Sequence, residues 1–391
     1  MDIKTLSDIC NYRKETLPSN KCDRMTFIST ENMLPNKAGV VISAKCPTSG
    51  NVSKYYPGDV LVSNIRPYFK KIYLADKEGA CSNDVLVFFP KREVCTSDFL
   101  FCLLSTDAFF AHATKTAKGT KMPRGDRSAI MGYQINWVPI NEQSGISEPI
   151  LNVYRKIKLN EKINDNLLEQ CACKFQEMFV CNSQAPTWPD SSLLNLIEKT
   201  ISGDWGKEQP TGMYTEKVLC VRGADIPDLK KGKKGKTPTR YILAKNCSTK
   251  KLNCDDIIVE ISGGSPTQST GRTVLVSDAL ISQHGNVICT NFCRALRPKK
   301  DYSFYIYYYL EHLYKKGIMF SYENGTTGIK NLDLSSFLKK ENIKLPPIEE
   351  VMKFSNFAKK CHKLINQNGL ENEALQIIRD NLLRMAFLPK S

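Results

Sequence analysis

The chain has 391 residues, of which 41% are hydrophobic and 24% charged, a composition typical of a globular protein with two or three domains. Its longest apolar runs, such as Val85–Phe89 and Tyr305–Leu310, are far shorter than the roughly 20 residues of a membrane-spanning helix. No basic segment followed by an apolar core opens the chain. We therefore expect no signal peptide, no membrane partner and a cytoplasmic location.

The net charge is the first indication of a partner. Lysine and arginine number 55 against 40 aspartates and glutamates, which gives a net charge of +15. Such a surplus favours a polyanionic partner, most commonly nucleic acid. A basic protein without such a partner remains an alternative, because charge alone does not decide between the two.

The 15 cysteines are scattered and lie mostly among hydrophobic neighbours, as Cys102 does. In a reducing compartment such residues behave as small buried hydrophobes. A zinc site requires closely spaced sets of ligands, and neither Cys171-x-Cys173 nor Cys289-x3-Cys293 has a second pair at a suitable spacing. We therefore expect no metal in this chain.

The predicted elements occur twice in the same order, which indicates an internal repeat. Early in each half, β-branched residues between turn residues predict a strand, at Gly58–Ile65 and again at Cys254–Ile261. A second strand follows in each half, at Asp84–Pro90 and at Asn291–Pro298. Both halves are therefore expected to contain a β-rich domain.

A helical segment and a Gly-Thr step come next in both halves. The helical segments are Phe99–Leu104 and Tyr305–Leu310, and they lead to Gly119-Thr120 and to Gly325-Thr326. The second Gly-Thr step lies 206 positions after the first, so the repeat keeps its spacing over most of each half.

Each half ends in a long helix with a narrow apolar seam. In the first half, Glu148–Val180 is 33 residues long, or about 50 Å of helix. A shift of 208 positions superposes Asn160 on Asn368 and Asn164 on Asn372, all at seam positions. Buried seam asparagines fix the register of paired helices, so we predict two antiparallel helices locked into one alignment. Alternatively, each helix packs only on its own domain.

Two β-rich domains in tandem, each followed by a long helix, resemble the DNA specificity subunits of type I restriction–modification systems. The resemblance covers essentially the whole chain and rests on the paired strands, the Gly-Thr steps and two further features. Pro139–Glu142 is echoed by Pro346–Glu350, and an Asn-x-x-Leu signature occurs at Asn164–Leu167 and Asn372–Leu375. The sequence departs from a smooth helix start at Asn141–Ile146.

The resemblance implies an α+β fold with two tandem β-rich target-recognition domains, each followed by a long helix, and the two helices forming an antiparallel coiled coil. The implied segments are a first target-recognition domain at 1–147, a first spacer helix at 148–182, a second target-recognition domain at 183–346 and a second spacer helix at 347–391.

The resemblance also implies a function and partners. Such a chain recognises the two parts of a split double-stranded DNA target and has no catalytic residues or cofactor of its own. Its partners are two copies of an adenine methyltransferase subunit, which binds S-adenosylmethionine, and restriction subunits with motor and nuclease activity. The related halves match the two copies by symmetry.

Basic residues near glycines are the candidates for phosphate contact, and side chains able to read base edges accompany them. The strongest basic stretch, together with an arginine that follows it, supplies Lys230, Lys231, Lys233, Lys234, Lys236 and Arg240. The first half supplies Lys118, Thr120, Lys121, Arg124 and Arg127. The candidates for base contact are Arg66, Gln268 and Arg272.

Catalytic motifs are weak in this sequence. Gly264–Thr273 resembles a phosphate-binding loop but lacks the Gly-Lys-Ser/Thr ending, and no Asn-Pro-Pro-Tyr-like motif occurs. Two other functions stay open. One is a coiled-coil interaction scaffold that does not bind DNA. The other is a restriction endonuclease component, for which Asp255, Asp256 and Glu260 would be the metal-binding carboxylates.

Overall fold

The computed structural model describes residues 3–264, 268–325 and 330–387. The chain divides into two compact units, Met1–Ile157 with Ala374–Ser391, and Lys158–Glu373. This division differs from the predicted boundaries at 147, 182 and 346, because each unit contains a piece of both long helices as well as one β-rich domain. None of the helices in the described ranges has the length and hydropathy required to cross a membrane.

The first unit is built on a four-stranded antiparallel sheet in the order β2-β8-β5-β6. Its two central strands are rich in branched and aromatic residues and almost completely buried, so both sheet faces are covered. The helix α2 packs its phenylalanines and leucines against this sheet. The bounds are Cys10–Tyr12 for β2, Val85–Pro90 for β8, Val60–Ser63 for β5, Ile72–Leu74 for β6 and Ser97–Leu104 for α2.

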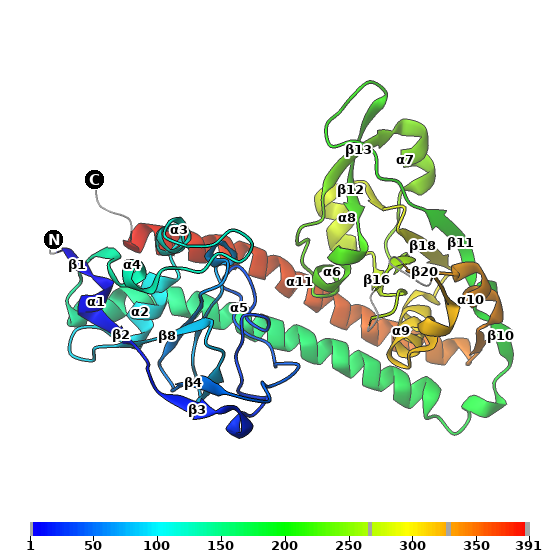
Figure 1. The fold of residues 1–391 in the computed structure, drawn as a ribbon. Coiled ribbons are helices and arrows are strands. Elements are labelled where there is room, and N and C mark those ends of the chain that lie inside the picture. The colour runs from blue at the N-terminus through cyan, green and yellow to red at the C-terminus, as the bar shows by residue number, and fades with distance from the viewer. Residues whose placement is uncertain (1–2, 265–267, 326–329, 388–391) are drawn as a thin grey trace. The chain divides into compact units, whose positions relative to one another are not determined.

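Smaller elements complete the first unit (Figure 1). The strands β1 (Ile3–Thr5) and β9 (Gln134–Asn136) pair with each other, so the beginning of the domain lies against its end. A three-stranded sheet contains β3 (Thr16–Pro18), β4 (Asn51–Tyr55) and β7 (Gly79–Cys81). The short helices are α1 (Leu6–Ile9), α3 (Asp107–Lys115) and α4 (Arg127–Met131).

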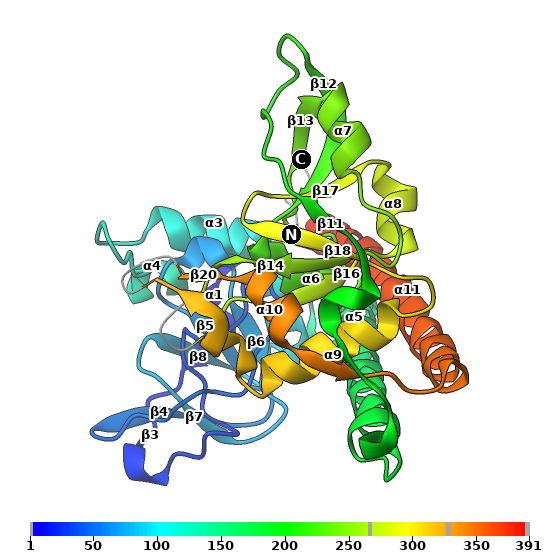
Figure 2. The same ribbon diagram turned by 90° about the vertical axis from the view of Figure 1, so that its right-hand side faces the viewer.

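The second unit repeats the four-stranded sheet. Its order is β11-β18-β14-β16, and all neighbours are again antiparallel (Figure 2). The strands predicted to correspond, β5 with β14 and β8 with β18, occupy the same central positions in the two sheets. The internal repeat is therefore a repeat of one sheet. The bounds are Ile197–Ser202 for β11, Cys293–Pro298 for β18, Ile257–Glu260 for β14 and Thr273–Leu275 for β16.

The second unit has two further sheets and a pair equivalent to β1 and β9, formed by β10 (Asp190–Ser192) and β21 (Asn342–Lys344). One sheet contains β13 (Thr239–Leu243), β12 (Tyr214–Val221) and β17 (Val287–Cys289). The other contains β15 (Ser262–Gly263), β20 (Lys330–Leu332) and β19 (Glu323–Asn324). The helices are α6 (Ile226–Lys230), α7 (Ala244–Lys250), α8 (Asp278–His284), α9 (Ser303–Lys315) and α10 (Leu334–Lys340).

The first long helix, α5, covers Ile140–Phe175 and continues in a π-type turn to Val180. It begins eight residues before the predicted boundary at 148, and Pro149 lies inside it. Gln143 holds the first turns in place, because its buried amide donates to the carbonyls of Val94 and Val138 at 2.8 and 3.0 Å. These contacts stabilise a helix start that the irregular stretch Asn141–Ile146 left undetermined in the sequence.

The second long helix, α11, covers Ile348–Phe387 and runs antiparallel to α5 within each unit. In the second unit Asn160 contacts Asn372, and Phe175 lies 5.6 Å from Phe354 between ring centroids. In the first unit the guanidinium of Arg379 lies over the ring of Tyr154. The antiparallel helix pair that the sequence predicted is therefore present.

Candidate nucleic-acid interface

The loop between α3 and α4 carries most of the basic residues predicted to bind DNA in the first half. It closes into a narrow turn, in which the backbone N–H of Lys118 donates to the carbonyl of Arg124 at 2.8 Å, and the N–H of Arg124 donates to the carbonyl of Lys118 at 2.9 Å. Gly119 has a φ of +95°, which suits a glycine at the tip. The loop and the first residue of α4 expose Lys118, Thr120, Lys121, Arg124 and Arg127.

Arg66, a candidate for base contact, lies beside this loop although it is far away in the sequence. Its backbone N–H donates to the carbonyl of Pro123 at 2.8 Å, and its guanidinium donates to the carbonyl of Lys121 at 3.3 Å. Its Nε is buried with no hydrogen-bond partner in the described part of the chain. We refer to Arg66 and the five exposed loop residues named above as the basic cluster.

Two cations of the basic cluster form ion pairs with nearby carboxylates. Lys118 Nζ lies 2.6 Å from Asp126 Oδ2, and Arg124 Nε lies 2.9 Å from Asp84 Oδ1. The hydrogen bond from Lys118 lowers the pKa of Asp126 to about 2. The side chains of Lys118 and Arg124 are 81% and 54% exposed, and exposed pairs of this kind contribute little to stability. Phosphate groups can therefore replace these carboxylates at small cost.

The strongest basic stretch of the sequence, Lys230–Lys236, has a different environment. We call it the lysine loop. Three of its five lysines form ion pairs with acidic residues of helices, and the backbone N–H of a fourth, Lys234, donates to Glu373 of α11 at 2.8 Å. The pairs are Lys230 with Glu311 of α9 at 2.7 Å, Lys231 with Asp165 of α5 at 3.0 Å, and Lys233 with Glu161 of α5 at 2.9 Å.

The two predicted arginines of the second unit are also engaged. Arg240 is 6% exposed, stacks over the ring of Trp205 at 4.0 Å and forms an ion pair with Glu208 at 3.0 Å. Arg272 donates two hydrogen bonds to Glu260, at 2.7 and 2.6 Å, and these raise the pKa of its guanidinium further. Both side chains therefore hold neighbouring parts of the unit together.

Other predicted residues of the second unit lie at the surface. Lys236 and Gln268 are exposed. Residues 265–267, which precede Gln268 in the predicted base-reading loop, lie outside the described residues. In the second Gly-Thr step, Gly325 is described, whereas Thr326 and the three residues after it also lie outside the described residues.

Two of the three carboxylates considered for a nuclease centre are bound to arginines. Asp256 accepts two hydrogen bonds from Arg297, at 2.9 and 2.8 Å, and Glu260 accepts two from Arg272. Asp255 has a φ of +66° at the turn before β14. Within the described ranges, no group of three or more His, Cys, Asp or Glu side chains is arranged to hold a metal ion.

The structure brings together the four asparagines predicted to pair the long helices. Asn160 donates to Asn372 Oδ1 at 3.0 Å, and Asn368 donates to Asn164 Oδ1 at 2.8 Å. All four residues are at most 9% exposed. Such pairs make one register of the helices more favourable than its neighbours, because a shift would leave buried amides unpaired.

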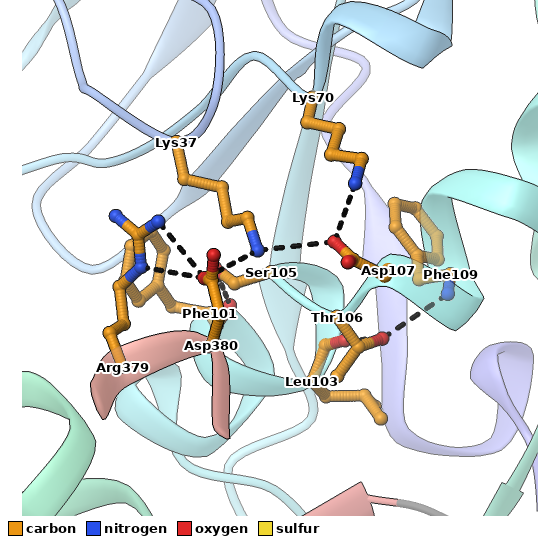
Figure 3. A network of polar contacts seen from close by, with 10 residues as sticks. All are labelled: Lys37, Lys70, Phe101, Leu103, Ser105, Thr106, Asp107, Phe109, Arg379 and Asp380. Atoms are coloured by element: carbon orange, nitrogen blue, oxygen red, sulfur yellow. Dashed lines mark hydrogen bonds and ion pairs between the residues drawn. The ribbon is translucent and has the colours of Figure 1, made fainter. Parts of the chain in front are cut away.

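Sequence reasoning missed a charged network that joins the first β-rich domain to α11 (Figure 3). Lys37, whose side chain is 3% exposed, lies 3.2 Å from Asp107 of α3 and 2.9 Å from Asp380 of α11. Lys70 also contacts Asp107, and Arg379 contacts Asp380. Lys37 and Asp380 are 343 positions apart, so no local pattern in the sequence indicated this contact.

The family model for the type I restriction modification DNA specificity domain matches residues 1–169 and 226–379. The chain belongs to this family, and membership implies recognition of a DNA target. The two matched regions correspond to the two repeated halves, which confirms the resemblance seen in the sequence.

The chain is also similar to individual proteins. The specificity subunit of the type I restriction enzyme EcoDI from Escherichia coli is 26% identical over 115 residues, which are 29% of this chain and 25% of that protein. The type I S subunit from M. genitalium has 14% identity and a TM-score of 0.61, with 100% of this chain and 96% of that one covered, so the two share a fold. The HsdS subunit from Thermoanaerobacter tengcongensis has 17% identity and a TM-score of 0.36, with 99% and 96% covered.

Proposed function

We propose that the chain recognises a split double-stranded DNA target, with one β-rich domain reading each part. The observation that carries this proposal is the repeat of one sheet, in the same strand order, in two units of a family that recognises DNA. Two similar domains in one chain suit two separate short sequences better than one continuous sequence, since each domain has its own surface for a groove.

The basic cluster is the proposed DNA contact of the first unit. Its exposed cations suit phosphate groups, and Arg66 at its edge suits a guanine, which arginine binds through two hydrogen bonds. In the second unit Lys236 and Gln268 are the exposed candidates. For Lys230, Lys231 and Lys233, phosphate contact stays a prediction, and each would have to leave a carboxylate partner.

The partners follow from the family and not from any residue described above. We propose that the chain is a non-catalytic subunit that directs two copies of an adenine methyltransferase subunit to the target, with restriction subunits joining them. S-adenosylmethionine would bind to the methyltransferase subunit and not to this chain. The repeated halves offer two similar docking surfaces, as binding of two identical partners requires.

Single-molecule methylome sequencing of the source cell, with and without this gene, tests the proposal. We expect deletion to remove adenine methylation at one split motif and to leave other methylation unchanged. A complementing copy of the gene with the basic cluster neutralised should restore less methylation than the unchanged gene. An unchanged methylome in a strain that expresses the gene would contradict the proposal.

A further inference from the structure

The lysine loop touches the long helices backbone to backbone. Gly232 in the loop and Gly369 in α11 approach so closely that a Cβ on Gly369 would collide with the carbonyl oxygen of Gly232. A Cβ on Gly232 would lie 2.5 Å from the carbonyl oxygen of Ile365, and Gly232 also has a φ of +74°. No side chain separates the two segments at this point, so the loop has little freedom to shift along the helix.

Hydrogen bonds from the helices hold the loop backbone on both sides of this contact. Asn164 of α5, which is 1% exposed, donates to the carbonyl of Lys231 at 3.2 Å as well as to the carbonyl of Ile365 at 3.1 Å. On the other side, Glu373 of α11 accepts from the N–H of Lys234 at 2.8 Å. One seam asparagine thus binds both the partner helix and the β-rich domain.

Ion pairs complete the attachment. Lys233, whose side chain is 16% exposed, contacts Glu161, and Lys231 contacts Asp165, both on α5. Burial alone would raise the pKa of Glu161, but its hydrogen bonds with Lys158 and Lys233 outweigh burial and lower the pKa. The carboxylate is therefore charged at neutral pH and holds the lysine in place.

We propose that the lysine loop is a clasp that fixes the second recognition domain at one position on the helix pair, and so determines which spacing between the two target parts the protein accepts. This inference rests on the proposed function. Helix residues rise by about 1.5 Å, whereas base pairs in DNA are about 3.4 Å apart. A shift of the domain by about two helix residues would therefore correspond to one base pair of spacing.

The first test is Gly369→Ala with Gly145→Ala as its matched control. Both glycines lie inside long helices, where alanine is the better helix former, but Gly145 has no atom within 4 Å of an added Cβ. In the full chain, we expect G369A to displace the clasp and to raise tryptic cleavage after the lysines of the loop by about tenfold or more. We expect G145A to leave cleavage unchanged or slower. Equal cleavage in the two variants would overturn the inference.

The second test measures spacing. The chain, reconstituted with its methyltransferase subunits, is given DNA whose target parts are separated by the native spacer or by one base pair more or less. We expect G369A to lose about tenfold in methylation rate on the native spacer, and its preference over the altered spacers should decrease. G145A should keep the methylation rate and the spacing preference of the unmodified chain. An unchanged spacing preference in G369A would overturn the inference, whereas no methylation of a split target by the unmodified chain would overturn the proposed function.

A third variant separates the clasp from direct DNA contact. Lys231→Gln with Lys233→Gln removes two ion pairs with α5. The clasp predicts faster tryptic cleavage at the remaining lysines and a relaxed spacing preference. Phosphate contact predicts instead a slope of log affinity against log salt that falls by about 0.9 for each lysine, with spacing unchanged. The second result would overturn the inference.

Discussion

The two units contain the same four-stranded sheet but use their cations differently. In the first unit five of the predicted DNA-binding side chains are exposed, and Lys118 and Arg124 form ion pairs with carboxylates of the same β-rich domain. In the second unit Lys230, Lys231 and Lys233 bind acidic side chains of helices. A repeated fold therefore does not imply a repeated use of charge, and basic residues must be judged by their partners before DNA binding is inferred.

The attachment to the long helices differs in the same way. The first domain reaches α11 through apolar contacts, such as Phe99 with Phe387 at 5.3 Å between ring centroids, and through the buried ammonium group of Lys37, which lies between Asp107 and Asp380. The second domain adds a backbone contact, two hydrogen bonds to the loop backbone and two ion pairs with α5. We therefore expect the second domain to be the more sensitive to changes in the helices.

The largest expected effect is on DNA affinity. Lys118→Gln, Lys121→Gln and Arg127→Gln together should lower affinity on the order of 10²–10³-fold and reduce the salt slope by about 2–3, because up to three phosphate contacts are lost. Fluorescence anisotropy over a salt series measures both quantities. The control changes three exposed lysines of the same unit, Lys14, Lys21 and Lys45, to glutamine. An equal loss in the control would mean that only net charge matters.

A partly buried histidine should make the second unit sensitive to acid. Burial lowers the pKa of His362 to about 4, and its ring contacts the Tyr308 hydroxyl at 2.8 Å. Because the folded-state pKa is below the ordinary value of 6.5, its contribution to stability is complete above pH 6.5 and is lost as pH falls towards 4. We expect a loss on the order of 3 kcal/mol in the free energy of unfolding of this unit.

Hydrogen exchange, corrected for intrinsic rates, checks this expectation in α9 against α2 at pH 7 and pH 5. Protection should fall in α9 and change less in α2. His362→Gln should remove most of the pH dependence. If α9 in this variant still loses as much protection at pH 5, another group is responsible.

Replacing different seam asparagines should lower the free energy of unfolding by different amounts. Asn164→Ala removes the partner of the Asn368 amide and a donor to the lysine loop, so we expect it to cost about 2 kcal/mol. Asn160→Ala should cost less, because the Oδ1 of Asn160 is buried without a hydrogen-bond partner in the described structure. Urea denaturation compares the two variants, and equal costs would contradict the link between Asn164 and the loop.

The smallest effect concerns the carboxylates that attach the domains. Both Glu161 and Asp107 have lowered pKa values, since contacts with lysines outweigh the effect of burial. Their contributions are therefore present above the ordinary values of 4.5 and 3.8 and are lost as pH falls below them. We expect Glu161→Gln to cost about 1 kcal/mol at pH 7 and almost nothing at pH 3.

Asp107→Asn should cost less than Glu161→Gln at pH 7, because the side chain of Asp107 is 64% exposed and that of Glu161 only 21%. Urea midpoints at the two pH values measure both costs. A larger cost for Asp107→Asn would reverse the comparison between the two attachments.

The local pattern of residues was enough to predict the repeated sheet and the helix pair from the sequence. Strands such as β5 and β14 have β-branched residues between turns, and both faces of each are buried, so their positions follow from short-range preference and hydrophobicity. The seam asparagines repeat with the helix period, so their pairing follows from periodicity. The start of α5 did not follow, because Gln143 is held by contacts with Val94 and Thr96, far earlier in the chain.

Tertiary structure alone decided how the charged residues are used. The sequence of a run of lysines does not show whether its side chains contact DNA or a carboxylate of the same chain. The acidic partners of Lys233 and Lys37 lie 72 and 343 positions away. Nor does composition distinguish an exposed arginine such as Arg124 from Arg272, which Glu260 binds through two hydrogen bonds. The sequence by itself determined where strands and helices form, since that depends on neighbouring residues, whereas the pairing of charges depends on which distant segments the fold brings within about 4 Å.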